Sequence, residues 1–85
     1  MIERIILGVQ VTNRVENILE VQKILTEYGC NIKTRLGLHD LNENTCSSVG
    51  LLLLETYGEE AKIHEMEAKL KGIKGLDVQK MVFKR

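Results

Sequence analysis

The chain has 85 residues, twelve basic and twelve acidic side chains that cancel, and two cysteines. This length allows one domain with one hydrophobic core, and the lack of a basic surplus excludes a free-standing nucleic-acid binder. Cys30 and Cys46 form no CxxC pair, so we expect no disulfide scaffold. The N-terminal apolar run is too short for a signal peptide or a membrane span. We therefore expect a cytoplasmic protein with no membrane partner.

The first elements predicted are a strand and a helix. Residues 2–11 are rich in β-branched side chains and predict a strand. Asn13 and Glu16 have the spacing of a helix N-cap and its reciprocal partner, and apolar residues follow at helical spacing, which predicts a helix over residues 14–28. Gly29 is expected to end this helix with a positive φ. The apolar stripe comprises Ile18, Val21, Leu25 and Tyr28, widened by Leu19 and Ile24.

Two strands joined by a polar loop come next. Residues 31–38 alternate between apolar and polar and predict the second strand. The apolar residues expected on one side of it are Ile32, Leu36 and Leu38. Residues 39–48 are polar and turn-like, and residues 49–56 predict a third, strongly apolar strand.

A second helix and a final strand complete the chain. Residues 59–71 begin with acidic and end with lysine side chains, which suits the dipole of a helix, and residues 76–83 predict a strand. The apolar stripe of this helix is Ile63, Met66 and Leu70, followed by Ile73. These residues lie 45 positions after the stripe of the first helix, so the chain contains one strand–helix–strand pattern twice.

The duplicated pattern predicts an α+β fold for residues 1–85 as a single domain. Two right-handed βαβ units interleave into a ferredoxin-like, ACT-like βαββαβ sandwich, with a four-stranded antiparallel sheet of order 4-1-3-2 and both helices on one face. The first and third strands are the apolar ones and the second and fourth carry charges, as central and edge strands should. One face of the sheet is then left uncovered by helices.

Apolar side chains are expected on that uncovered face. If Ile5, Leu7 and Val9 face the helices together with Leu52 and Leu54, alternation along the strands turns Ile6, Leu51 and Leu53 the other way. An exposed apolar patch of this kind usually marks a partner surface. The alternative explanation, that these are scattered surface hydrophobic residues, is the less common one. We therefore predict homo-oligomerisation, as a dimer or tetramer, through Ile6, Leu51 and Leu53 on the sheet face, through an edge strand, or through both.

The run Glu20–Leu38 (EVQKILTEYGCNIKTRLGL) resembles ACT-type regulatory domains, in which a helix ending in Leu-x-x-x-Gly leads into an Asn-Ile strand. Arg35-Leu36-Gly37-Leu38, the short polar loop and the apolar strand Val49–Leu54 extend the resemblance, over Arg4–Phe83, to the small stand-alone iron-only hydrogenase system regulators. The resemblance implies an ACT-like fold, a homo-oligomer and a regulatory role. It also implies a ligand-binding turn after the first strand, here Thr12-Asn13-Arg14, but this turn lacks the usual glycine, which argues against amino-acid binding by the usual route.

The chain shows no local pattern for catalysis or for a metal site. His39, Asp40 and Cys46 fall in or near the predicted loop, with Cys30 and His64 elsewhere, and no HxH, CxxC or HxxxH spacing joins two of them. We predict no metal ligands and no catalytic residues, and the sequence names no cofactor. Lys33 and Arg35, on the second strand, either meet an anion or acidic partner or serve as solvated charges that keep an edge strand from pairing.

These observations lead to a function hypothesis and one alternative. The chain is expected to be a non-enzymatic regulatory or sensor module that homo-oligomerises and takes a small-molecule or metal effector at its subunit interfaces. The alternative is a structural or adaptor module that binds another protein and has no small-molecule ligand.

Overall fold

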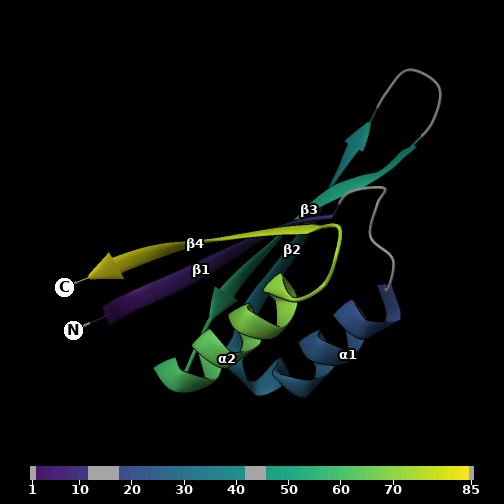
Figure 1. Ribbon diagram of the computed structural model, residues 1–85. Helices are drawn as coiled ribbons and strands as arrows, with labels where there is room; N and C mark the ends of the chain where they lie inside the picture. The colour runs from purple at the N-terminus through teal and green to yellow at the C-terminus, as the bar shows by residue number, and fades with distance from the viewer. Residues whose placement is uncertain (1, 12–17, 42–45, 85) are drawn as a thin grey trace.

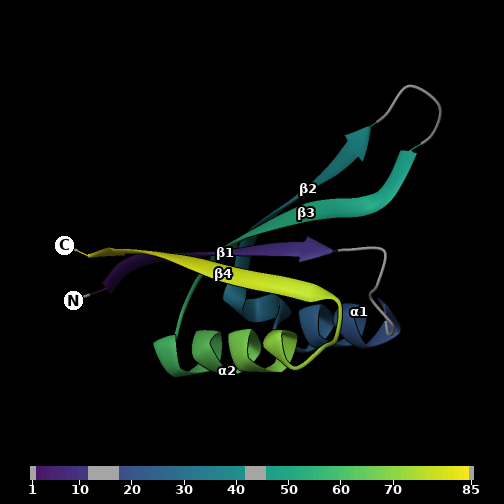
Figure 2. The same cartoon turned by 45° about the horizontal axis from the view of Figure 1, so that its top comes forward.

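A computed structural model describes residues 2–11, 18–41 and 46–84, and these form one antiparallel sheet and two α-helices. The elements are β1 (Ile2–Val11), α1 (Ile18–Glu27), a 3₁₀ turn (Gly29–Asn31), β2 (Ile32–Leu41), β3 (Cys46–Thr56), α2 (Glu60–Lys71) and β4 (Leu76–Lys84). The strands are ordered β2-β3-β1-β4, and both helices lie on the same side of the sheet in two views (Figure 1, Figure 2). The predicted ferredoxin-like fold and strand order are confirmed.

The hydrophobic core fills the layer between the sheet and the two helices. Ile5, Leu7 and Val9 of β1 are buried there, and Leu7 lies directly opposite Leu54 of β3, which is also buried. From α1 and α2 the core receives Val21, Ile24, Leu25, Tyr28, Ile63, Met66 and Leu70. The alternation predicted for the two central strands is therefore confirmed.

The apolar stripe of α1 is narrower than its sequence suggests. Val21, Ile24 and Leu25 are buried as predicted, but Leu19 is 77% exposed and does not widen the stripe. Leu19 follows Ile18, itself half-exposed, at the first described turn of the helix. At about 100° per residue, Leu19 lies roughly 160° around the helix axis from Val21, so its side chain points away from the sheet. The predicted N-cap pair, Asn13 and Glu16, lies outside the described residues.

A charged contact joins the two helices at the surface. The Lys69 ammonium of α2 donates to Glu27 Oε2 of α1 at 2.9 Å and lies 5.1 Å from the centre of the Tyr28 ring. The hydrogen bond with Glu27, helped by Tyr28, raises the pKa of Lys69 above its usual value. Lys69 therefore stays charged throughout the physiological range and fixes the end of α1 against α2.

The hairpin formed by β2 and β3 is longer than predicted. Residues 39–48 were expected to form a polar loop, but β2 continues to Leu41 and β3 begins at Cys46, with His39 paired to Gly50 and Leu41 to Cys46. Backbone hydrogen bonds set the length of a hairpin ladder, and polar side chains do not interrupt them. The far part of this hairpin projects beyond the helices (Figure 2).

An irregularity in β2 places Ile32 and Leu36 on opposite faces of the sheet, although the sequence predicted the same side for both. Ile32 pairs with Thr56, and Thr34 pairs with the adjacent Glu55, so Lys33 is an extra residue in a β-bulge. Ile32 packs against the core, whereas Leu36 is exposed. A bulge reverses the alternation that follows it, and alternation alone cannot reveal one.

Helix α1 does not end with a glycine of positive φ, as the sequence predicted. Gly29 was expected to have a positive φ, but among the described residues only Gly58 and Gly75 do, and the chain continues from α1 into the 3₁₀ turn. Asn31 holds this turn: its backbone N–H donates to the Tyr28 carbonyl at 2.8 Å, and its own carbonyl accepts from the Tyr57 N–H at 2.8 Å. These bonds satisfy the end of α1 without a left-handed residue.

Gly58 is the glycine whose replacement should be costly. Its φ is +92°, and an added Cβ would lie 3.1 Å from Asn31 Nδ2, which donates to the Tyr57 carbonyl. We expect Gly58→Ala to lower the free energy of unfolding by about 1–2 kcal/mol, because a side chain is strained in this conformation. Urea denaturation of the variant measures the loss. Gly29→Ala is the matched control, since Gly29 lacks a positive φ and an added Cβ there meets nothing within 4 Å; an equal loss in both variants would contradict the prediction.

Candidate functional site

The sheet face opposite the helices carries an apolar patch that crosses all four strands. Its members, here called the open-face patch, are Ile6, Leu36, Leu51, Leu53, Met81 and Phe83. Leu36 lies opposite Leu53, and Ile6 lies opposite Met81, so the patch is built from cross-strand pairs. Leu36, Met81 and Phe83 are 51%, 54% and 47% exposed. The residues predicted for the interface, Ile6, Leu51 and Leu53, thus lie together on this face.

The charges next to the open-face patch neutralise one another. Arg4 Nε lies 3.5 Å from Glu55 Oε2, and the Thr34 hydroxyl donates to Glu55 Oε1 at 3.0 Å. In the register Thr34 and Glu55 are opposite one another, and Arg4 is opposite Phe83 of the patch. Because these groups satisfy one another within one subunit, they present little net charge to a second surface brought against the sheet.

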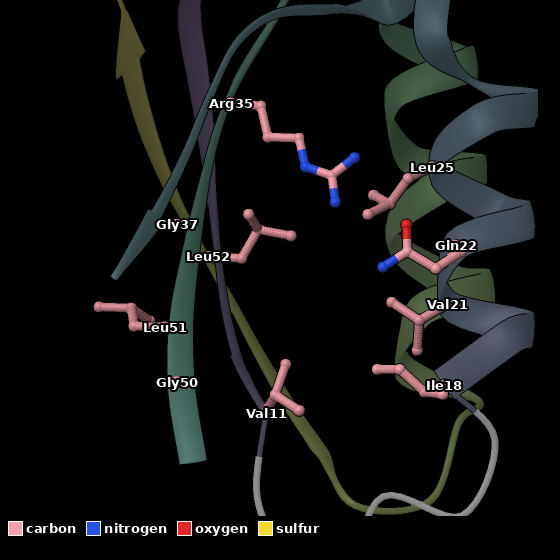
Figure 3. Close-up of a pocket in the computed structure, with 10 residues that line it drawn as sticks. All are labelled: Val11, Ile18, Val21, Gln22, Leu25, Arg35, Gly37, Gly50, Leu51 and Leu52. Atoms are coloured by element: carbon pink, nitrogen blue, oxygen red, sulfur yellow. The ribbon is translucent and has the colours of Figure 1, made fainter. Parts of the chain in front are cut away.

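A cavity of about 460 Å³ lies on the other side of the sheet, between α1 and the β2–β3 hairpin (Figure 3). Its walls are mostly apolar and include Val11, Ile18, Val21, Leu25 and Leu52. We call it the α1 cavity. Its size lies within the range of small-molecule sites in proteins. Leu51 also borders the cavity, but its side chain points away from it (Figure 3).

Two polar side chains reach into the α1 cavity. Arg35 extends its guanidinium from β2 toward α1, and Gln22 turns its carboxamide from α1 toward the sheet (Figure 3). Arg35 lies opposite Leu54, which is buried under the helices, so Arg35 belongs to the helix-facing side of its edge strand. No acidic residue lines the cavity among the residues that the structure describes.

A buried carboxylate occupies the other end of the helix-facing layer. Glu67 of α2 is 6% exposed, and its Oε1 accepts from the Lys80 ammonium of β4 at 3.2 Å. The Lys71 ammonium lies 3.3 Å from Oε2, close enough for an ion pair but not aligned as a hydrogen bond. His64 Nδ1 is 3.6 Å from Oε1.

The two lysines decide the ionisation of Glu67. Burial alone would raise the pKa of its carboxyl group, but the hydrogen bond from Lys80 and the charges of Lys80 and Lys71 outweigh burial and lower that pKa. The carboxylate is therefore ionised at neutral pH and joins α2 to β4. This arrangement has the form of a structural ion-pair network, in which one buried acid has two cationic partners.

The predicted site residues are scattered in the structure. The turn Thr12-Asn13-Arg14 lies outside the described residues, although Val11 and Ile18, which flank segment 12–17, both border the α1 cavity. His39 and Asp40 are in β2 and Cys46 begins β3. Cys30 is exposed in the 3₁₀ turn, and His64 lies on the surface of α2, 3.1 Å from Glu60 Oε1.

Metal-ligand residue types do not gather in the part of the chain that the structure describes. No group of three or more His, Cys, Asp or Glu side chains there is placed to hold an ion. Neither α1 nor α2 has the length and hydrophobicity required to span a membrane. The open-face patch and the α1 cavity are two features of the described residues with a shape suited to binding; hollows of similar volume also lie between the helices beside Lys69 and along α1 beside Leu19.

Sequence reasoning missed the α1 cavity, although the sequence carries a signal for it. Gly37 and Gly50 stand in the interiors of β2 and β3, where glycine is unfavourable unless something needs the space. Arg35 was predicted either to meet an anion or acidic partner or to serve as an edge charge, but its direction toward α1 was not, because the bulge that sets this direction was not foreseen. Glu67 was missed because nothing in a run of alternating charges marks one carboxylate as buried.

Comparison with known proteins identifies the fold. No family model matches this chain, and no curated protein matches it. Among solved structures, it is similar to the uncharacterized protein TM1266 from Thermotoga maritima, with 25% identity, a TM-score of 0.71, and coverage of 99% of this chain and 100% of that chain. It is also similar to a formyltetrahydrofolate deformylase from Pseudomonas putida KT2440, with 11% identity and a TM-score of 0.56. That match covers 93% of this chain but only 28% of the deformylase, and it shows the fold alone.

Proposed function

We propose that this protein is a non-enzymatic regulatory module that homo-oligomerises and binds a small effector. The observation that carries the proposal is the open-face patch, in which Leu36, Met81 and Phe83 are each about half exposed on a face that no helix covers. Small domains bury a low fraction of their surface, and association is a common way to offset that deficit. An isologous pairing of two copies would bury this patch against itself.

The uncharged character of the patch favours a second copy over a charged partner. Arg4, Thr34 and Glu55 satisfy one another within the subunit, so this cluster adds little like-charge repulsion where two identical faces meet, and the exposed Asp77 lies toward the other end of β4 from Met81 and Phe83. The finer proposal, that the regulated system is an iron-only hydrogenase, rests on the sequence resemblance of Arg4–Phe83.

Replacing Leu36 by glutamate tests the oligomer. We expect the wild-type protein to sediment as a dimer or larger species at micromolar concentration, and Leu36→Glu to weaken association at least about 30-fold, since a carboxylate buried without a partner costs roughly 2 kcal/mol or more. Analytical ultracentrifugation over a concentration series measures the change.

Leu19→Glu is the matched control for this experiment. Leu19 is the more exposed of the two leucines but lies on α1, away from the open face, so its substitution should leave the sedimentation profile unchanged. A wild-type protein that remains monomeric would contradict the oligomer proposal and favour an adaptor that uses this patch for a different protein. Equal weakening by both substitutions would place the interface elsewhere.

A further inference from the structure

The α1 cavity exists because two strand positions that face α1 carry no side chain. Gly37 lies opposite Leu52, and Gly50 lies opposite Val11; Leu52 and Val11 both pack against the core side. A Cβ added at Gly37 would meet nothing within 4 Å, so no neighbouring atom requires glycine there. Glycine inside a strand also weakens the strand. The two glycines therefore lower the stability of the strands, and packing does not require glycine at position 37.

A cation with no partner faces this space. Arg35 is exposed and makes no hydrogen bond or ion pair with any residue that the structure describes; Lys23 and Lys33 also lack a partner there, but neither lines the cavity. Gln22, on the opposite wall, adds an amide group that can donate a second hydrogen bond. A planar guanidinium beside an amide donor suits the two oxygens of a carboxylate.

We infer that the α1 cavity binds a small monocarboxylate with an apolar body, whose charged end is held by Arg35 and Gln22. The apolar walls formed by Val21, Leu25 and Leu52 would enclose the hydrocarbon part. This inference deepens the proposed function, on which it rests, by naming the class of effector. It places the effector inside one subunit, between α1 and the sheet, and not at the subunit interface that the sequence led us to expect.

The charges that line the cavity favour a carboxylic acid over a free amino acid or a phosphate. A free amino acid also carries an ammonium group, and no carboxylate among the described lining residues could pair with it. A phosphate would bring close to two negative charges to a single arginine and has no apolar part for the walls. A carboxylic acid without an amine matches both the one cation found among the described lining residues and the apolar surface.

Isothermal titration calorimetry with 4-methylpentanoate tests this inference. We expect saturable binding at one site per chain, with Arg35→Gln weakening the affinity about 10- to 100-fold and Arg35→Lys weakening it less, because lysine keeps the charge but loses the two-point contact. Leucine, inorganic phosphate and 4-methylpentan-1-ol are the comparison probes, and each should bind at least tenfold more weakly than the acid.

Gly37→Val provides a test that does not touch the charge. A valine side chain would occupy the floor of the cavity and should abolish binding, while the free energy of unfolding stays the same or rises. Failure of 4-methylpentanoate to bind, equal binding of the alcohol, or binding that survives Gly37→Val would overturn the inference. Sedimentation of the same samples keeps the two proposals apart: a monomer that binds the acid would contradict the oligomer and leave the effector site standing.

Discussion

Leu7→Ala is expected to lower the free energy of unfolding by about 2–5 kcal/mol, enough to unfold much of so small a domain at physiological temperature. Leu7 is completely buried in the central strand β1, where it faces both helices. It lies opposite Leu54 on one side and Lys80 on the other, within the buried core, so truncation leaves a cavity there.

Chemical denaturation followed by far-ultraviolet circular dichroism measures this loss. Leu19→Ala is the control, since it removes the same atoms from an exposed position on α1 and should change the free energy of unfolding by less than about 0.5 kcal/mol. A loss at Leu7 no larger than that at Leu19 would contradict the core as described.

Lys80→Met is expected to lower the free energy of unfolding by about 1–3 kcal/mol at pH 7. The substitution keeps most of the side-chain volume but removes the ammonium that donates to Glu67 Oε1 at 3.2 Å. The buried carboxylate is then left with Lys71, which is not aligned as a hydrogen-bond donor. Lys23→Met, at an exposed position on α1, should have little effect on stability.

The effect of Lys80→Met should depend on pH. In the wild-type protein the pKa of Glu67 is lowered from 4.5, so its ionisation stabilises the fold above the unfolded pKa, and this stability is lost as the pH falls through the folded value. In the variant only Lys71 still opposes the effect of burial, so the pKa of Glu67 is lowered less and its ionisation stabilises the fold less. The stability difference between the two proteins should therefore shrink as the pH falls from 7 to below 4.5.

A double substitution measures the interaction between Glu67 and Lys80 separately from the other effects of each substitution. Once Glu67→Gln removes the charge, Lys80→Met should cost much less than it does alone, because no buried carboxylate remains to be left without its donor. Additive losses, or a difference between the proteins that is constant across pH, would show that Lys80 stabilises the fold through its aliphatic stem instead.

The fold was predictable from the sequence because two independent patterns agree. The helical stripe of Ile63, Met66 and Leu70 repeats that of the first helix, and the leucines of β3 mark it as a central strand. The residues at which the strands begin and end were less predictable. The β2–β3 hairpin extends through polar residues because backbone pairing needs no apolar side chain, and its length was therefore invisible to a hydrophobicity pattern.

The candidate site was predictable only on the open face. Ile6, Leu51 and Leu53 follow from strict alternation, but Leu36, Met81 and Phe83 complete the patch from the edge strands. The direction of Arg35 depends on the bulge at Lys33, which is a property of the register between two strands and is not encoded in any local periodicity. The α1 cavity, on the helix-facing side, could therefore be identified only from the three-dimensional structure.

Because Gly37 and Gly50 leave the space of the α1 cavity, the cavity could be lost by substitution without loss of the fold that contains it. A single codon change at position 37 would fill it while leaving every strand and helix in place, since an added Cβ there meets no neighbour. Evolution could therefore gain or lose an effector along this lineage without passing through an unstable intermediate. If the proposed carboxylate binds there, a chain of this topology with a larger residue at position 37 is expected not to bind it.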